Sequence, residues 1–189
     1  GLYVKFSEEG KLLQSSYVGE NSYYFDSARR IGNKIFIGSL LFGTSNATVA
    51  FYQLDTSSNI LTIFKEIIVP NNLQTGTFTD LQNNFYITGS IFPGDSNVNN
   101  ITTTNSYEPI IGNYLSSFYI KYDSKFDEIW GTFYVGDGGT QSPHIYQDYD
   151  GYLYFTGMSS NNKTGISTSG TFQQSSGSSN DLFIAKFKD

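Results

Sequence analysis

The sequence contains no cysteine and only one histidine, so several kinds of site lack the side chains they need. Without thiols there can be no disulfide framework and no thiolate nucleophile. A zinc site needs several nitrogen or sulfur ligands, and His144 alone cannot supply them. His144 would also have to be the base of any histidine-dependent nucleophilic site. A lone histidine beside Pro143, with no recognisable nucleophile or acid, instead predicts a structural role.

Positive charge and long apolar runs are also scarce. The chain has 11 Lys and Arg against 17 Asp and Glu, a net charge of −6. Nucleic acid and anionic membranes are bound through clusters of Lys and Arg, so we expect neither as a partner. The adjacent pair Arg29-Arg30 is predicted to lie in a solvated loop or at a strand end. Runs such as Ile67-Ile68-Val69 are far below the roughly 18 residues of a membrane-spanning helix, so no span is predicted.

Aromatic and small polar residues dominate what is present. Of 189 residues, 38% are hydrophobic and 17% aromatic, with 16 Phe and 15 Tyr but one Trp and one Met. This content is enough for a sizeable core and is typical of a globular chain. Phe and Tyr favour strands, while Asn, Ser, Thr and Gly favour turns. Since no stretch has a sustained helical period, the sequence predicts an all-β protein.

One stretch of the sequence occurs twice. Residues 101–123 and 166–188 align without a gap at a shift of 65 positions. Internal repetition of this kind is typical of folds in which each repeat is one supersecondary unit. The matched pairs include Ile101 with Ile166, Thr103 with Thr168, Tyr107 with Phe172, Gly112 with Gly177, Phe118 with Phe183, Lys121 with Lys186 and Tyr122 with Phe187.

Two kinds of hairpin alternate along the chain. Their turns are rich in Gly, Asn, Asp or Ser, which suit tight turn geometry. The first kind is expected at 2–18, 49–68 and 118–135, and its first strand returns alone at 182–187. The second kind is expected at 27–41, 77–92 and 145–158, with turns at Gly32-Asn33, Gln82-Asn83-Asn84 and Asp150-Gly151. Together these runs predict thirteen strands.

The hairpins combine into four-stranded antiparallel units, an arrangement typical of β-propeller blades. We therefore predict one β-propeller region over residues 1–189. Residues 2–18 should be the third and fourth strands of a partial blade, 26–68 and 76–135 two complete blades, and 143–188 the first three strands of another partial blade. The second and third strands are joined by a short link at 43–47 in the first complete blade and by the repeated stretch in later units. A connection of that length should pack along its blade rather than extend into solvent.

Four segments of the chain carry a recognisable pattern: 181–187 (DLFIAKF), 129–136 (IWGTFYVG), 151–157 (GYLYFTG) and 168–173 (TSGTFQ). They resemble the SBBP repeat, which builds seven-bladed β-propellers in secreted bacterial proteins. The resemblance covers nearly the whole chain. It is weaker in the first complete blade, where Gln53 stands in place of the lysine.

The resemblance implies an extracellular or bacterial cell-surface protein, exported by Bacteroidetes-like bacteria through type IX secretion. The family has no defined catalytic residues to carry over. We therefore expect a secreted interaction or scaffold module that has no catalytic activity, cofactor or metal of its own and that binds a protein or glycan. Two alternatives stay open: a non-catalytic propeller domain of a larger carbohydrate-active enzyme, and a cargo or accessory protein of a type IX-like secretion system.

Acidic residues offer one candidate metal site. Asp148 and Asp150 precede Gly151 as at the start of a calcium loop, where alternate carboxylates and a turn glycine surround the ion. No closing glutamate follows, so a plain hairpin turn is the competing interpretation. The pairs Glu8-Glu9 and Asp127-Glu128 are interpreted as solubilising charges, because adjacent strand residues point to opposite faces and cannot converge in one cleft.

Short motifs suggest modification or sugar binding. Three Asn-x-Thr sequons begin at Asn46, Asn100 and Asn162, in the expected connections between second and third strands. Asp26-Ser27-Ala28 is similar to the O-glycosylation motif of Bacteroidetes exports. The many Tyr and Phe residues could offer stacking platforms for sugars, but in a propeller most of them form the core between blades.

The propeller interpretation also predicts where burial is greatest. Each blade should have an inner strand, next to the central channel, and a second strand that is buried on both faces. The inner strands are expected at 27–31, 77–81 and 145–149, and the buried parts of their neighbours at 35–37, 85–87 and 153–155.

The predicted strand order does not close a ring, so we expect an open arc of a larger propeller. A closed ring needs about four blades or more. An open arc exposes aromatic faces and strand edges that other sequence must cover, and the expected partner is further propeller sequence on the same polypeptide or on a second copy. Sedimentation and thermal denaturation of the 189-residue chain test this expectation. A soluble monomer that unfolds cooperatively would contradict this expectation.

Overall fold

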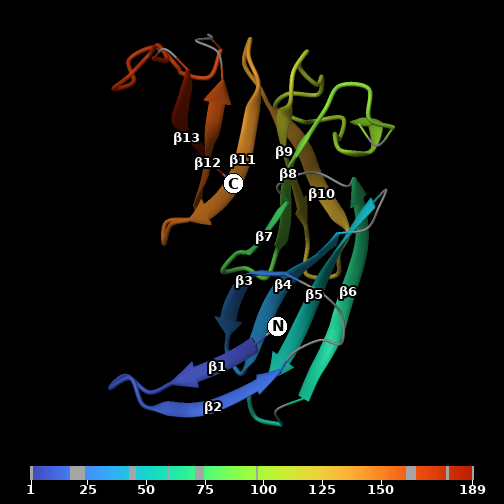
Figure 1. Cartoon of the computed structure of the whole chain (residues 1–189), viewed down its shortest axis with the longest axis vertical. Helices are drawn as coiled ribbons and strands as arrows, with labels where there is room; N and C mark the ends of the chain where they lie inside the picture. The colour runs from blue at the N-terminus through green and yellow to red at the C-terminus, as the bar shows by residue number, and fades with distance from the viewer. Residues whose placement is uncertain are drawn as a thin grey trace.

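Antiparallel strands make up nearly all the regular structure of the computed structural model, which describes residues 2–17, 24–42, 46–58, 60–70, 75–96, 98–160, 165–177 and 179–188 (Figure 1). The all-β prediction and its thirteen strands are confirmed in these residues. The elements are β1 (Leu2–Phe6), β2 (Leu12–Tyr17), β3 (Tyr24–Ile31), β4 (Lys34–Phe42), β5 (Asn46–Asp55), β6 (Ile60–Pro70), β7 (Gly76–Thr79), β8 (Phe85–Ile91), the 3-10 helix η1 (Val98–Asn100), β9 (Ser116–Tyr122), β10 (Glu128–Tyr134), β11 (Thr140–Gln147), β12 (Tyr152–Ser160) and β13 (Asn180–Lys188).

The strands of the described residues form four antiparallel sheets. Two of them have four strands, in the orders β3-β4-β5-β6 and β7-β8-β9-β10. The sheet β11-β12-β13 has three strands and the sheet β1-β2 has two. Within each sheet, strands that are consecutive in the chain pair with each other, and none of these sheets closes on itself. The described residues thus form four antiparallel sheets, and the division of the chain into complete and partial blades stays a prediction.

Turn residues with positive φ mark the three equivalent hairpins. They are Gly32 (φ 60°) between β3 and β4, Asn83 (φ 68°) between β7 and β8, and Gly151 (φ 86°) between β11 and β12. Glycine and asparagine adopt this conformation at little cost. Phe126 (φ 67°) in the β9–β10 turn is bulky and adopts it only with strain. Its ring stacks on the buried ring of Phe85 at 4.3 Å between centroids, and this contact offsets the strain.

The largest core lies between the β3–β6 sheet and the β7–β10 sheet. The ring of Phe85 meets Phe36 at 5.4 Å and Phe51 at 5.0 Å between centroids, both edge to face. Such pairs contribute about 0.5–1.5 kcal/mol each beyond the area they bury. The buried residues of this core are Phe36, Leu40, Ala47, Val49, Phe51, Val69, Phe85, Ile87, Ile91, Ile101, Phe118, Ile120, Phe126, Phe133 and Val135.

A second core joins the β7–β10 sheet to the β11–β13 sheet. Tyr119 stacks on Phe155 at 3.9 Å between ring centroids. Burial raises the pKa of the Tyr119 hydroxyl, and so does the neighbouring Tyr134. Because successive strand residues point to opposite faces, β8 supplies Phe85 to the first core and Tyr86 to the second. The β7–β10 sheet is thus buried on both sides by aromatic packing.

Each of these two sheets repeats one glycine and phenylalanine contact. A β-carbon on Gly89 of β8 would lie 2.6 Å from the ring of Phe118 on β9. A β-carbon on Gly157 of β12 would lie 2.8 Å from the ring of Phe183 on β13. The glycines that recur in the second strands therefore give the phenylalanine rings of the third strands room to lie across the sheet.

The connection that contains the first copy of the repeat runs along the outer edge of β10. The Thr103 N–H donates to the Gly131 carbonyl at 3.2 Å, and the Phe133 N–H donates to the Glu108 carbonyl at 3.1 Å. Ile101 of this connection is 1% exposed and belongs to the first core. The connection therefore packs along its sheet, as predicted, and covers an edge that would otherwise be open to pairing.

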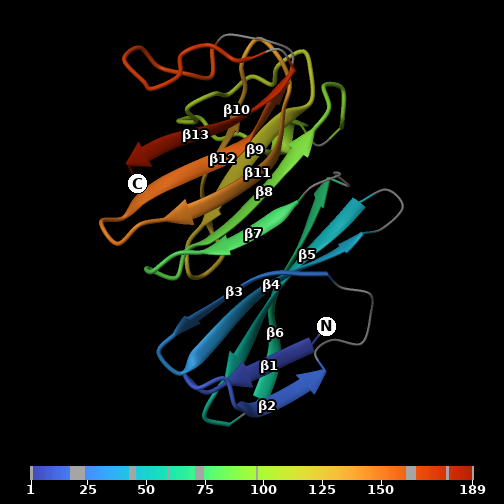
Figure 2. The ribbon, with the colours of Figure 1, turned by 60° about the vertical axis from the view of Figure 1, so that its left-hand side comes forward.

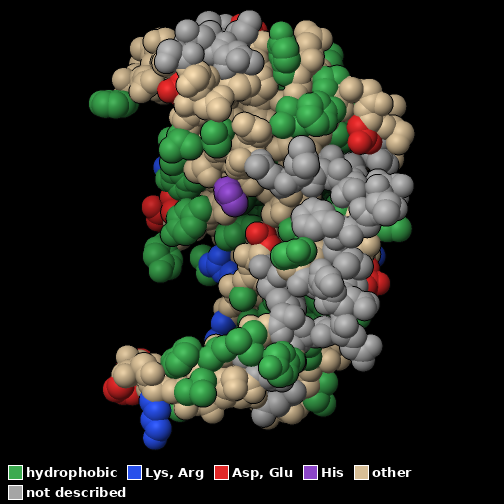
Figure 3. Space-filling model, in the orientation of Figure 1, with side chains coloured by type: hydrophobic (Ala, Val, Ile, Leu, Met, Phe, Trp, Pro, Cys, Tyr) green, Lys and Arg blue, Asp and Glu red, His purple; other side chains and the backbone are tan. Residues whose placement is uncertain are grey.

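The first strands of the three larger sheets lie next to one another. β3 and β4 contact β7, and β11 contacts β7, β8 and β9 (Figures 1 and 2). The Thr77 N–H and hydroxyl donate to the Asp26 carboxylate, and the Ser27 hydroxyl lies 2.7 Å from the Thr77 hydroxyl. In Figure 3 the molecule has a C-shaped outline that is hollow on one side.

Both ends of this stack of sheets keep exposed apolar side chains. At one end they lie on β1 and β2, and at the other they lie on the face of β11–β13 that points away from the second core. No described segment covers either surface. The exposed residues are Leu2, Phe6, Leu12 and Leu13 at the first end and Tyr146, Leu182 and Ile184 at the other.

The three predicted inner strands differ from their predicted bounds, and β3 begins at Tyr24, three residues before the predicted start. β7 ends at Thr79, because Asp80 already accepts the hydrogen bonds of the turn that follows. β11 begins at Thr140, earlier than the sequence indicated. The pairing of β11 with β12 shifts in register between Gln141 and His144. This irregularity lets β11 continue through a point where the alternation of its side chains is interrupted.

Replacing a central aromatic residue by a charge tests this packing. Phe85→Asp and Phe155→Asp should each lower the free energy of unfolding by about 4 kcal/mol or more, because each removes a 1% exposed ring and buries a carboxylate. Tyr149→Asp, at a 94% exposed position, is the control. Denaturant unfolding of the three variants measures the difference, and near-neutral effects at Phe85 and Phe155 would contradict the sheet packing.

Candidate functional site

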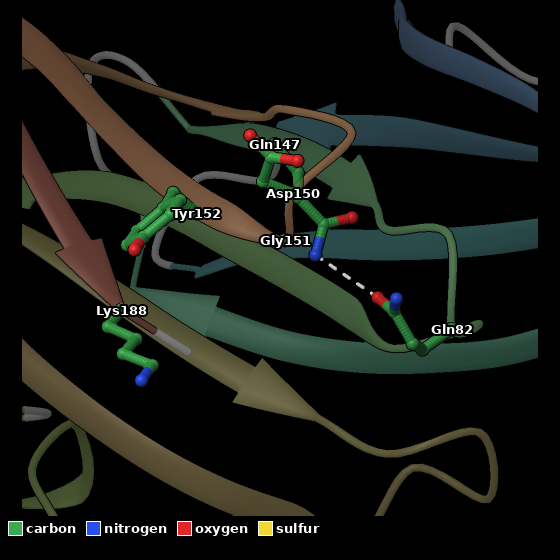
Figure 4. Close-up of a pocket in the computed structure, with 6 residues that line it drawn as sticks. All are labelled: Gln82, Gln147, Asp150, Gly151, Tyr152 and Lys188. Carbon is green, nitrogen blue, oxygen red and sulfur yellow. Dashed lines mark hydrogen bonds between the residues drawn. The ribbon is translucent and has the colours of Figure 1, made fainter.

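A cleft of about 230 Å³ opens between the β7–β8 turn and the β11–β12 turn (Figure 4). It lies where the β7–β10 sheet meets the β11–β13 sheet. An amide, a carboxylate, an ammonium and a phenol line it, a mixture suited to hydrogen bonding with a polar ligand. The lining residues are Gln82 from the first turn, Gln147, Asp150, Gly151 and Tyr152 around the second, and Lys188 from the end of β13.

Two glutamines hold the walls of the cleft together. The Gln147 side-chain amide donates to the Gln82 side-chain carbonyl at 3.1 Å. The Gln147 side-chain carbonyl accepts the Leu81 N–H at 3.0 Å. Gln147 is 4% exposed, and its two partly buried hydrogen bonds fix one turn against the other. This link could not be predicted from the sequence, because the two residues belong to different repeats.

Two aspartates at equivalent positions build the turns beside the cleft. Asp80 accepts the Gln82 and Asn84 N–H groups at 2.8 Å each and the Tyr86 hydroxyl at 3.0 Å. Asp148 accepts the corresponding groups of its own turn, from Asp150, Tyr152 and Tyr154. Each carboxylate thus satisfies turn N–H groups and one tyrosine hydroxyl.

The carboxylate of Asp148 is therefore already engaged by donors. Desolvation, the largest single influence, raises its pKa, but the Tyr152 N–H, the Tyr154 hydroxyl and the Asp150 N–H together lower it below the usual range. The positive charge of Lys186 lowers this pKa further. Asp148 therefore serves to form the hairpin turn, which is the interpretation that competed with a calcium loop. Asp150 is exposed at the cleft.

Lys186 lies over two tyrosines on the open face of β11–β13. Its Nζ atom is 3.8 Å from the ring centroid of Tyr152 and 5.4 Å from that of Tyr154. The hydrogen bond with Tyr154 is the main cause of the raised pKa of Lys186, and the negative charge of Asp148 adds to it. A cation therefore occupies one face of the Tyr152 ring beside the cleft.

His144 and the adjacent acidic pairs stay apart from the cleft. His144 is exposed on β11 opposite Thr156, and none of the described side chains forms a hydrogen bond or ion pair with it. Glu8-Glu9 lies in the turn between β1 and β2, and Asp127-Glu128 lies at the start of β10. These residues come from three different sheets, and the structure does not bring them together.

The prediction for Arg29 needs correction. Arg29 lies within β3, where its guanidinium donates to the Thr79 carbonyl at 3.0 Å and lies 5.6 Å from the ring centroid of Phe78. It therefore helps to join β3 to β7 instead of being merely solvated. Arg30 is exposed near the strand end and donates to the Gly32 carbonyl at 3.0 Å, as expected.

The modification motifs have mixed placements. Ser27 uses its hydroxyl in the contact with Thr77, so the O-glycosylation-like motif contributes to the junction between sheets. The Asn46 sequon lies in β5 and not in a loop, since β5 begins directly at Asn46. Asn100 is exposed in η1, and the Asn162 sequon lies outside the described residues.

Among the described residues, no group of three or more His, Asp or Glu is placed to hold a metal ion. No helix in the same residues is long and apolar enough to cross a membrane. No family model matches the chain, and no curated protein matches it either. The resemblance to the SBBP repeat therefore rests on the motifs quoted above.

The role of the turn aspartates can be tested at Asp80. Asp80→Ala should lower the free energy of unfolding by about 2–4 kcal/mol, because it strips the N–H groups of Gln82 and Asn84 of a buried, charged acceptor. Asp150→Ala, in the equivalent turn but exposed, should have little effect. Urea unfolding of both variants makes the comparison, and equal stabilities would contradict the role assigned to Asp80.

Proposed function

We propose that the chain is a secreted or cell-surface interaction and scaffold module, built from blades of a larger β-propeller and without catalytic activity of its own. Three observations support the blade arrangement: the strand order within each sheet, the face-to-face packing through aromatic cores, and the adjacent first strands β3, β7 and β11. The resemblance to the SBBP repeat supports export. Further blades of the same polypeptide are the proposed partners of the two exposed ends.

The cleft between the two turns is the proposed ligand site, and it is the observation that carries the function. Propeller turns at one end of the blades form a common surface, and the cleft lies where two such turns meet. Its groups can donate and accept hydrogen bonds: the Asp150 carboxylate, the Lys188 ammonium and the Gln82 amide. A glycan, with many hydroxyl groups, is the ligand that this pattern fits best.

The chemistry of the lining supports binding without turnover. Glycoside hydrolysis commonly uses two carboxyl groups on either side of the scissile bond. Asp150 is the one carboxylate among the described residues that line the cleft. Gln82 and Gln147 are fixed by their mutual hydrogen bond. The cleft thus offers recognition groups that are held in place, as a binding site requires.

A glycan array combined with cleft variants tests the proposal. The wild-type chain should bind a subset of glycans, and Asp150→Ala and Lys188→Ala should each weaken binding by about fivefold or more through loss of a polar contact. Lys125→Ala, an exposed lysine in the β9–β10 turn, should leave binding unchanged.

Two results would contradict this function. Equal binding by all variants, or ligands found on a protein array only, would contradict the assignment of the cleft as a glycan-binding site. Release of sugar from a bound glycan would show catalysis and would favour a domain of a carbohydrate-active enzyme.

A further inference from the structure

The two copies of the repeated stretch fold alike. The Ser106 N–H donates to the Thr103 carbonyl at 3.1 Å, and the Thr171 N–H donates to the Thr168 carbonyl at 3.4 Å. Each of these residues lies 65 positions from its counterpart. A second hydrogen bond recurs at the same shift, from Thr102 to the carbonyl of Pro109 in the first copy and from Ser167 to the carbonyl of Gln174 in the second.

Only the first copy has a strand to bind in the described residues. There Thr103 and Glu108 hydrogen-bond to the outer edge of β10. Their counterparts, Thr168 and Gln173, are exposed. β13 is the last strand of its sheet in the part of the chain that the structure describes, and Figure 2 shows the loop before it on the side away from β12. We call the outer edge of β13, together with residues 165–177, the strand slot.

The aromatic contacts of the two copies also differ, because the first copy has a strand beside it. Tyr107 in the first copy lies 6.2 Å from the ring of Tyr134 on β10 and 5.5 Å from that of Phe187 in the next sheet. Its counterpart Phe172 is fully exposed. Ile184, the counterpart of the buried Tyr119, is also exposed. In the second copy, Phe172 and Ile184 are thus exposed apolar side chains. In the first copy, a strand and a further sheet pack against their counterparts, Tyr107 and Tyr119.

We propose that the strand slot receives an antiparallel β-strand of the same repeat type as β10, supplied from outside the described residues. This proposal rests on the blade arrangement proposed above. The proposal predicts the register of the incoming strand on β13 from that of β10 on β9, where Phe118 pairs with Phe133 and Ile120 pairs with Gly131. The incoming strand accordingly has an aromatic residue opposite Phe183 and a glycine opposite Ala185, the counterparts on β13.

The loop of residues 165–177 requires the glycine that the incoming strand places opposite Ala185. A β-carbon at Gly131 would overlap the carbonyl oxygen of Ile101 in the first copy. The Gly131 N–H donates to the Thr103 hydroxyl at 3.3 Å, so the backbone of β10 lies directly against the loop. Because residues 165–177 have the same turn, a larger side chain at the corresponding position of the incoming strand would meet Ile166.

A peptide copy of β10 is the probe. A fluorescein-labelled peptide of residues 127–136, added to the intact 189-residue chain, should bind saturably and one to one by fluorescence anisotropy. The same peptide with Gly131→Val should bind about ten- to a hundredfold more weakly, because its side chain overlaps the loop. A scrambled peptide of the same composition is the second control.

Variants of the chain locate the binding. Thr168→Val removes the hydroxyl that accepts the glycine N–H and should weaken peptide binding by about three- to tenfold. Ser169→Ala, in the same exposed loop, should leave it unchanged. Circular dichroism of each variant confirms that the fold is kept, and both residues are exposed, so neither change should unfold the chain.

Three outcomes would overturn the proposal. They are equal binding of the native, Gly131→Val and scrambled peptides, binding unaffected by Thr168→Val, and a dimer that excludes the peptide because a second copy fills the slot. Asp150→Ala acts at the cleft, away from β13, and should leave peptide binding intact. A wild-type chain that binds the peptide but binds no glycan would contradict the proposed function alone.

Discussion

The structure depends on aromatic rings that pack between sheets. A β-strand shows alternate side chains on its two faces, and β8 and β9 use both faces for aromatic residues. The middle sheet therefore cannot be removed without exposing two cores at once. Phe85 illustrates the dependence, since its ring meets Phe36, Phe51 and Phe126 from two different sheets. Polar links such as those of Asp26 and Gln147 then fix the sheets side by side.

The repeat explains how such a stack of sheets forms from a few local interactions that recur along the chain. A turn with a residue of positive φ, a glycine under a phenylalanine ring, and an aspartate that accepts turn N–H groups recur from sheet to sheet. Each interaction acts between residues close in sequence or on neighbouring strands. Folding units with many local contacts can form semi-independently, and the contacts between sheets then add cooperativity.

Much of the fold could be predicted from the sequence because strand and turn signals are local. The alternation of β-type runs with Gly, Asn and Asp turns located thirteen strands. Strand ends were harder: the bulge near His144 lengthens β11, and Asp80 shortens β7. The candidate cleft was not predictable, because Gln82 and Gln147 lie 65 residues apart and meet only once two sheets have packed. Asp148 was noticed, but its role as an acceptor for Tyr154 depends on side-chain direction within β12.

The matching turns at Ser106 and Thr171 have a consequence for the kinetics of assembly. Among the described residues, one loop has a strand beside it and the other has none, yet both hold the same hydrogen bond. The loop conformation is thus set by its own sequence and is not induced by the neighbouring strand. A preorganised surface loses little conformational entropy on association. Encounter with a strand would then be limited by diffusion and orientation and not by a loop rearrangement, so differences in affinity among strands should lie mainly in their dissociation rates.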